Sequence, residues 1–97
     1  MPTYISLLKF TDKGIQTIKE APKRVDAARK MAKAAGADIK AVYYVMGRFD
    51  AVVVSEAPDD ETAVRMALGG SMPGNVTSET LRAFPAEEFM KIVAKLP

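Results

Sequence analysis

The segment Gly47-Arg48-Phe49-Asp50 places two side chains close together that could bind an anion and accept a proton. Arg48 carries a planar guanidinium whose fork of donors matches a carboxylate or phosphate, and Asp50 is an acceptor or base. The same residues suit a tight connection between two strands, because glycine tolerates a positive φ and aspartate bonds nearby backbone amides. Turn chemistry is the favoured interpretation, and a ligand-binding hairpin is the alternative.

Three further polar residues belong to strand-like segments and join Arg48 and Asp50 as candidates. Tyr44 precedes the connection, and Glu56 and Arg82 stand among apolar residues. A charge inside a strand is costly to bury unless it is paired, so these groups either meet in a polar pocket or lie at strand ends and edges. The predicted ligand-binding residues are therefore Tyr44, Arg48, Asp50, Glu56 and Arg82, near the rim of a cavity at the hairpin end of the sheet. No catalytic residue is assigned.

The composition excludes many kinds of metal site and catalytic mechanism. The chain has no cysteine and no histidine, which excludes disulfides, thiolate zinc sites, iron–sulfur clusters, cysteine nucleophiles and the commonest general base. The acids Asp59, Asp60 and Glu61 fit the start of a helix better than a metal site. We therefore expect no metal and no cofactor.

The length and hydropathy predict one domain covering residues 1–97. Of the 97 residues, 48% are hydrophobic and 27% are charged, as in ordinary globular proteins. A chain of 10.5 kDa can bury about 64% of its unfolded surface, which supports a modest core. No apolar run approaches the ~20 residues that span a bilayer, and no secretory signal is visible at Met1. We expect a cytoplasmic protein that does not bind membranes.

Hydrophobic periodicity predicts the order βαββαβ followed by one more helix. The two middle strands are joined through the four-residue segment Gly47–Asp50, whose last residue also opens the second strand, and this length allows an antiparallel hairpin and forbids a parallel crossover. Gly14 weakens the first helical segment, and Gly69-Gly70 is interpreted as a helix end. The strands are expected at 3–10, 38–46, 50–57 and 76–84, and the helices at 11–20, at 22–35, from 58 to about 68, and from Pro85 onward.

This order predicts an α+β fold, a ferredoxin-like sandwich whose four-stranded antiparallel sheet carries two crossover helices on one face. The alanines of segment 22–35 indicate close packing of that helix on the sheet. Both sheet faces contain apolar residues, with Ile5 and Leu7 alternating with Tyr4 and Leu8. The uncovered face must accept the C-terminal helix, meet a second subunit or enclose a ligand. We expect a homodimer that buries at least ~1,000 Å².

Nucleic-acid binding is the rival function that the charge pattern raises. The basic residues between Lys19 and Lys33 alternate with acids at helical spacing, which is typical of a solvated helix face. An RNA recognition motif shares the strand order and reads bases with strand aromatics. Here Ala51 and Val53 follow Phe49 at the alternate positions, and they cannot stack on bases. We therefore expect no nucleic-acid partner.

Short motifs spread along the chain resemble one known family. They are TYISLLKFT at 3–11, Pro22-Lys23-Arg24, Val42-Tyr43-Tyr44, Gly47-Arg48-Phe49-Asp50-Ala51-Val52, Glu56-Ala57-Pro58-Asp59-Asp60, Gly74-Asn75-Val76 and Thr80-Leu81-Arg82-Ala83-Phe84. Together they resemble the GYD domain family over roughly residues 3–93, with Phe49 where the family's signature has tyrosine. The resemblance implies a ferredoxin-like domain similar to the dimeric α+β barrels, with no established activity.

Two functions remain open. The first is a small homodimeric module that binds a small molecule or regulates a partner. The alternative is a cofactor-independent enzyme of the dimeric α+β barrel type acting on a small organic substrate. Without histidine or cysteine, such an enzyme must use Asp50, Glu56, Glu79, a tyrosine or a lysine with a pKa shifted by burial.

Overall fold

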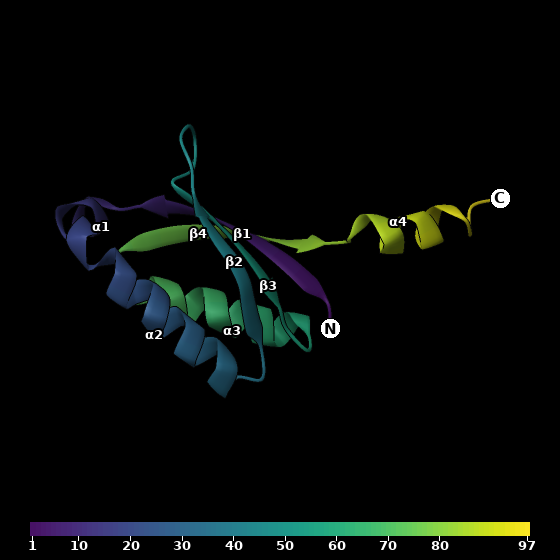
Figure 1. Cartoon of the computed structure of the whole chain (residues 1–97), viewed down its shortest axis with the longest axis horizontal. Helices are drawn as coiled ribbons and strands as arrows, with labels where there is room; N and C mark the ends of the chain where they lie inside the picture. Colours follow the sequence, from purple (N-terminus) through teal and green to yellow (C-terminus); the bar gives the residue numbers. More distant parts are fainter.

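The computed structural model describes residues 1–97 as a four-stranded antiparallel sheet with two long helices on one face (Figure 1). The α+β, ferredoxin-like architecture and the order of its elements are as the sequence predicts. The elements are β1 (Thr3–Phe10), α1 (Asp12–Gln16), the short 3₁₀ helix η1 (Ile18–Glu20), α2 (Ala21–Ala34), β2 (Asp38–Tyr44), β3 (Ala51–Glu56), α3 (Asp60–Ser71), β4 (Val76–Ala83) and α4 (Ala86–Val93).

The strands lie in the order β2-β3-β1-β4, so each crossover helix connects strands that are not neighbours. All three pairings are antiparallel, with Leu7 of β1 opposite Val52 of β3 and Glu79 of β4. A register shift at Ile39 and Ala41 interrupts the pairing of β2 with β3. The β2–β3 connection contains Gly47 at φ 106°, a conformation that glycine adopts without strain. The glycine part of the predicted turn chemistry is therefore present, whereas the Asp50 carboxylate accepts from the amide of Phe10 on β1 and not from an amide of the connection.

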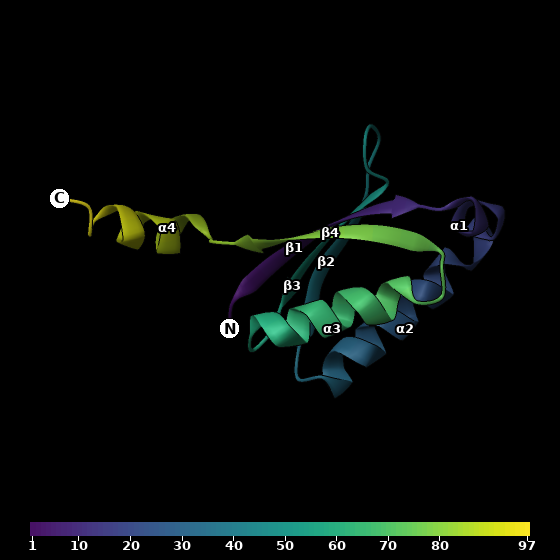
Figure 2. The same cartoon turned by 180° about the vertical axis from the view of Figure 1, so that it is seen from behind.

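Helices α2 and α3 run across the same face of the sheet, and small residues dominate the layer between them (Figure 2). The buried cluster consists of Tyr4, Ala32, Ala37, Ile39, Ala57 and Ala63. No large side chain is fully buried. Alanines occupy most of the core positions between the helices and the sheet, where larger apolar residues usually fill the space. The predicted close packing of α2 therefore holds only at its C-terminal end, and space remains elsewhere between the layers.

The opposite face of the sheet has no helix over it (Figures 1 and 2). Alternation along the strands places Ile5 and Leu7 of β1 on this face beside Val52 and Val54 of β3. These four side chains are half-buried by one another and by their neighbours in the sheet. We call this surface the open face. The homodimer predicted from it stays a prediction.

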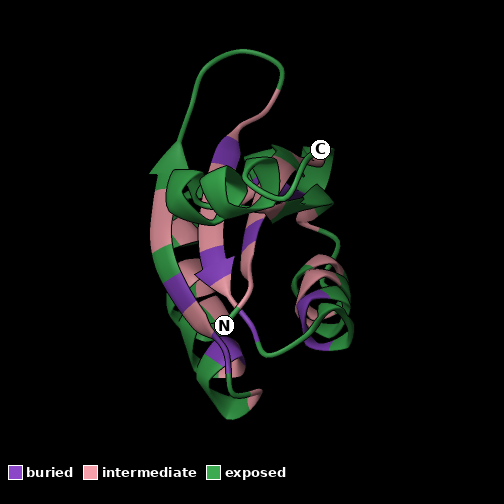
Figure 3. Cartoon of the chain, turned by 90° about the vertical axis from the view of Figure 1, so that its right-hand side faces the viewer, coloured by how far each residue is buried: buried purple, intermediate pink, exposed green.

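The predicted C-terminal helix is present, but it leaves the body of the molecule. Helix α4 continues in the direction of β4 beyond the end of the sheet (Figure 1). Viewed from that end it is coloured as exposed (Figure 3), and every one of its residues is exposed. The expected apolar stripe forms, yet Phe89 is 49% exposed and Ile92 is 44% exposed.

Helix α3 corrects one prediction about the helix ends. It continues through Gly69 and Gly70 to Ser71, so the interpretation of the two glycines as a helix end is wrong. A Cβ placed on Gly69 would lie 2.8 Å from the sulfur of Met31 on α2. Gly69 therefore allows the two helices to approach closely. Helix α3 continues through this residue because glycine costs only ~1 kcal/mol relative to alanine in a helix interior.

Candidate functional site

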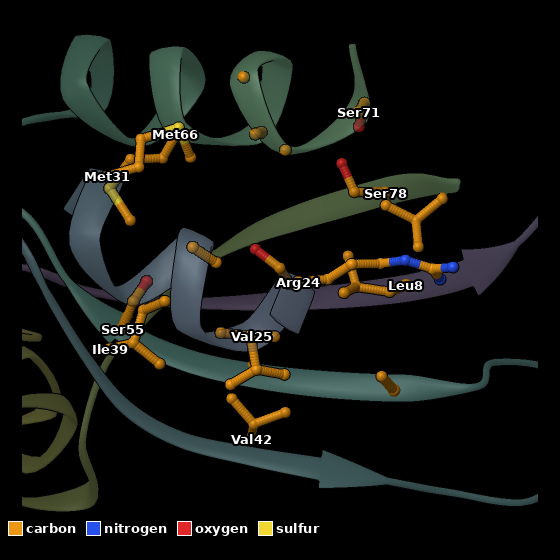
Figure 4. Close-up of a pocket in the computed structure, with 18 of the residues that line it drawn as sticks. Leu8, Arg24, Val25, Met31, Ile39, Val42, Ser55, Met66, Ser71 and Ser78 are labelled. Atoms are coloured by element: carbon orange, nitrogen blue, oxygen red, sulfur yellow. The ribbon is translucent and has the colours of Figure 1, made fainter. Parts of the chain in front are cut away.

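A cavity of about 290 Å³ lies between the sheet and helices α2 and α3 (Figure 4). Its floor consists of the strand side chains that point toward the helices, including Leu8 and Val42. Val25 and Met31 of α2 and Met66 of α3 form the opposite wall. We call this space the helix-side cavity. Its lining is mainly apolar, which is typical of sites that bind small molecules.

The polar groups of the helix-side cavity are almost all neutral hydroxyls. Ser6 on β1 and Thr80 on β4 hydrogen-bond to each other, with 3.1 Å between their hydroxyl oxygens. Ser55, Ser71 and Ser78 also line the space. Such hydroxyls donate or accept as a ligand requires, since each can rotate.

Arg24 is the one charged residue in the lining, and its guanidinium is already engaged. It donates to the carbonyl oxygen of Gly14 at 3.3 Å, to that of Thr17 at 2.5 Å, and to the Thr17 hydroxyl. These bonds join α2 to the segment before it. Arg24 therefore holds the wall of the cavity in place, and no carboxylate lines the space to act as a base.

Tyr4 lines the helix-side cavity and joins β1 to α3. Its ring is 3% exposed, and its hydroxyl donates to Oδ1 of Asp60 at 2.5 Å. The guanidinium of Arg82 lies 5.8 Å from the ring centroid. The hydrogen bond to Asp60, followed by burial, raises the pKa of Tyr4 above its ordinary value. The phenol therefore stays protonated, which makes it a donor rather than a base.

This contact predicts a specific ultraviolet titration. The raised pKa means that the hydrogen bond stabilises the fold below the ordinary tyrosine pKa, and that this contribution is lost as the pH rises through the raised value. We expect Tyr4→Phe to lose the tyrosinate absorbance component that titrates above the ordinary tyrosine range. Tyr43→Phe should keep it, because this change on β2 leaves the Tyr4–Asp60 hydrogen bond in place. If both variants kept that component, the Tyr4–Asp60 contact would be absent in solution.

Asp59 caps the start of α3, as its sequence position predicts, and Asp60 and Glu61 lie in the first turn of the helix. The carboxylate of Asp59 accepts from the Thr62 amide at 2.8 Å and from the Thr62 hydroxyl at 2.7 Å. These bonds lower the pKa of Asp59. Their contribution to stability is present above the ordinary carboxyl pKa and is lost as the pH falls through the lowered value.

At the hairpin end, the structure keeps two of the three predicted ligand-binding residues together and separates Arg48 from them. Tyr44 lines the helix-side cavity, with its ring centroid 6.5 Å from that of Phe10. Tyr44 and Asp50 also line a shallow depression together, and the Asp50 carboxylate accepts from the Phe10 amide at 2.8 Å. Arg48 is exposed in the hairpin loop that projects from the sheet, over the ring of Phe49 at 5.9 Å (Figure 1). Arg48 lines neither space.

Glu56 and Arg82 lie at the opposite end of the sheet from Asp50. Glu56 is 3.8 Å from the ammonium of Lys40, and Arg82 stacks 4.3 Å from the ring centroid of Phe84. The five predicted residues therefore do not form one cluster. Of these five, only Tyr44 lines the helix-side cavity.

The hydroxyls and small residues that line this cavity were not among the residues predicted from the sequence. The usable signal was the alternation of β4, which places Ser78 and Thr80 on the same face as Val76. A second signal was the run of alanines on α2, which was interpreted as close packing. Small side chains permit either close packing or empty space, and the local sequence does not distinguish the two.

A mainly apolar cavity under two helices, on a ferredoxin-like sheet without a metal-binding cluster, defines a small α+β domain with room for a ligand. The family model of the GYD domain matches residues 4–93, and the chain belongs to this family.

Two relatives from Thermus thermophilus are similar over most of the chain. One is named glutamine synthetase and cystathionine beta-lyase binding protein, and it is 34% identical over 91 residues, covering 93% of this chain and 96% of the relative. The other is the crystal structure of TTHA0845, with a TM-score of 0.55 and 24% identity, covering 88% of this chain and 95% of that one. The structural likeness supports the fold. None of the helices has the length and apolar character that crossing a membrane requires.

Proposed function

We propose that this protein is a binding module that holds a small, mainly apolar and uncharged molecule in the helix-side cavity. The observation that carries the proposal is the lining itself, which is apolar apart from hydroxyls, two phenols and one amide, and whose single cation is already bonded within the chain. A charged ligand would lose its hydration there without gaining a free partner of opposite charge. An apolar ligand with one or two hydrogen-bonding groups would bury its apolar surface there and form hydrogen bonds with the serine and threonine hydroxyls.

The test uses the uncharged fluorophore N-phenylnaphthylamine as the probe. We expect its emission to rise on binding to the wild-type protein, and Ala28→Leu to weaken that binding at least about tenfold by filling the cavity from α2. Ala67→Leu fills the same space from α3 and should act in the same way. Full binding by either folded variant, or no binding by the wild type, would contradict the proposal.

Ala34→Leu is the matched control. It makes the same change on α2 at an exposed position that does not line the cavity. Because leucine and alanine have similar helix propensities, the control tests the loss of cavity volume rather than the change in residue type. We expect unchanged probe affinity in this variant.

A protein partner is the second candidate function, favoured by the relative whose name gives glutamine synthetase and cystathionine beta-lyase as its binding partners. We propose that this chain binds an enzyme of this kind and that occupancy of the cavity regulates the contact through α2 and α3, which form its wall. Gel filtration of the purified protein with each purified enzyme tests this idea. Co-elution with either enzyme supports it, and separate elution from both opposes it.

The enzyme alternative has less support from the geometry. A cofactor-independent reaction needs a positioned acid or base, and the cavity offers no carboxylate or lysine. Its most buried ionisable group, the Tyr4 phenol, is held in the protonated form by Asp60. The lining therefore favours binding over catalysis.

A further inference from the structure

Ser55 of β3 carries a hydroxyl that has no hydrogen-bond partner in the chain. The residue is 6% exposed and lines the helix-side cavity, where its hydroxyl points toward the helices (Figure 4). No polar side-chain atom sealed in the core lacks a partner, so this hydroxyl is reachable from the cavity. A buried and unpaired hydroxyl that faces a cavity indicates a place for a group from outside the chain.

The residues around Ser55 offer its hydroxyl nothing to bond. Its neighbours across the strands are Tyr4 on β1 and Ile39 on β2. The Tyr4 hydroxyl donates to Asp60 at 2.5 Å, and Ile39 is apolar. A buried water molecule needs two or more polar partners, so water at Ser55 would be held weakly. A ligand group that makes the same hydrogen bond therefore displaces water there at little cost.

The helix-side cavity is long, and Ser55 stands at its buried end. Alternate residues of β1 line it from Tyr4 to Phe10, which at ~3.4 Å per residue is a length of about 20 Å. Near Ser55 the lining is buried, with Ile39 only 8% exposed, whereas Tyr44 and Ser78 farther along are exposed. A ligand that enters from the exposed side is therefore elongated, and its leading end reaches Ser55.

The buried end of the cavity disfavours a charged leading group. Arg24, the one charged residue of the lining, lies away from Ser55 (Figure 4) and is bonded to Gly14 and Thr17. A carboxylate or ammonium at Ser55 would exchange its hydration for a single hydroxyl. A carbonyl or hydroxyl group needs only one or two hydrogen bonds, and the serine hydroxyl both donates and accepts.

We propose that the ligand is an elongated neutral molecule of the long-chain alcohol, aldehyde or ketone class, whose terminal oxygen hydrogen-bonds to Ser55. Its apolar chain then lies along the cavity between Leu8 and Val42 on the sheet and Met31 on α2. The inference rests on the binding function proposed above, and it adds the class of the ligand, its direction in the cavity and the residue that selects it.

Displacement of N-phenylnaphthylamine by decan-1-ol tests this assignment. We expect decan-1-ol to bind the wild type. Ser55→Ala should lower the affinity for decan-1-ol about tenfold relative to that for N-phenylnaphthylamine, which has no oxygen to lose a hydrogen bond. Decanoate has the same chain with a charged end at neutral pH, and it should bind the wild type at least about tenfold more weakly than decan-1-ol.

Two variants on β4 are the controls. Thr77→Val removes a hydroxyl at an exposed position outside the cavity, so the affinity for decan-1-ol should stay within about twofold. Ser78→Ala removes one at the exposed part of the lining, where water replaces a lost bond, so it should cost less affinity than Ser55→Ala. A larger loss in Ser78→Ala than in Ser55→Ala would place the oxygen at the exposed side and overturn the proposal.

The other outcomes separate this inference from the binding function itself. A wild type that binds N-phenylnaphthylamine but not decan-1-ol, or that binds decanoate equally well, would overturn the ligand class while the binding function stands. If neither probe binds, both proposals fail. Urea denaturation of Ser55→Ala should show no fall in the midpoint, because the hydroxyl has no bond in the chain to lose. A lower midpoint would show that Ser55 is bonded within the fold, contrary to the proposal.

Discussion

Gly14→Ala is expected to lower the free energy of unfolding by about 3 kcal/mol, near the upper end for overpacking a single site. A Cβ on this residue would lie 2.0 Å from the carbonyl oxygen of Asn75, a backbone atom that cannot rotate away. That oxygen also accepts from the Thr11 amide at 3.0 Å. The new methyl group would therefore either separate α1 from the segment before β4 or break this bond.

The contact is tight because two more bonds hold the same two segments together, and a third fixes the first segment internally. The Thr11 hydroxyl donates to the Gly74 carbonyl at 2.6 Å, and the Lys13 ammonium donates to the Pro73 carbonyl at 2.7 Å. The Gly14 amide in turn donates to the Thr11 hydroxyl at 3.1 Å. Relief of the clash would require these groups to move together, so local relaxation recovers little of the lost stability.

Gly70→Ala is the control for this substitution. It makes the same change inside α3, where a Cβ would have no atom within 4 Å. We expect it to raise the free energy of unfolding by up to ~1 kcal/mol, since alanine favours a helix over glycine. Urea denaturation of both variants gives the comparison. An unchanged midpoint for Gly14→Ala would show that α1 does not approach Asn75 in solution.

Gly14 shows why part of the fold was predictable and part was not. Strand β1 has the bounds that its residues predict, because alternation of side chains is a local property. The short β2–β3 connection likewise determines an antiparallel pair. Gly14 was interpreted as a weak point in a helix, whereas its contact with Asn75 joins residues 61 positions apart. No local pattern encodes a contact of that separation.

The candidate site was predicted less well, for a physical reason. The five candidates were chosen because polar groups carry specificity, and alternation assigns each to a face of the sheet. Alternation says nothing of position along a strand. Glu56 follows Asp50 by six residues, which is about 20 Å of extended chain, so the two lie at opposite ends of one strand. The helix-side cavity arises from a deficit of side-chain volume among the alanines of α2 and α3. Whether small side chains leave a cavity depends on the distance between the helices and the sheet. Hydrophobic periodicity carries no information about that distance.

Asp50→Ala decides between the two interpretations of the Gly47–Asp50 segment. The Asp50 carboxylate accepts from the Phe10 amide at 2.8 Å, and its own amide donates to the Leu8 carbonyl at 2.8 Å. The side chain thus continues the pairing of β1 with the β2–β3 hairpin beyond the last paired residues. Loss of a charged acceptor leaves the Phe10 amide without this partner, which costs about 2 kcal/mol. We expect that loss in the absence of any ligand, measured by urea denaturation.

Two companion substitutions make the result specific to this bond. Asp50→Asn keeps a carbonyl oxygen at the same place, so it should recover about half of the loss, because neutral hydrogen bonds are weaker than charge-assisted ones. Arg48→Ala should leave stability within about 0.5 kcal/mol of the wild type, since Arg48 is exposed in the loop. If Asp50→Ala instead kept full stability, the carboxylate would be free to act on a ligand. We expect instead that Asp50→Ala loses stability, because the Asp50 carboxylate stabilises the fold through the Phe10 amide. Of the three candidates at the hairpin end, only Tyr44 lines the helix-side cavity.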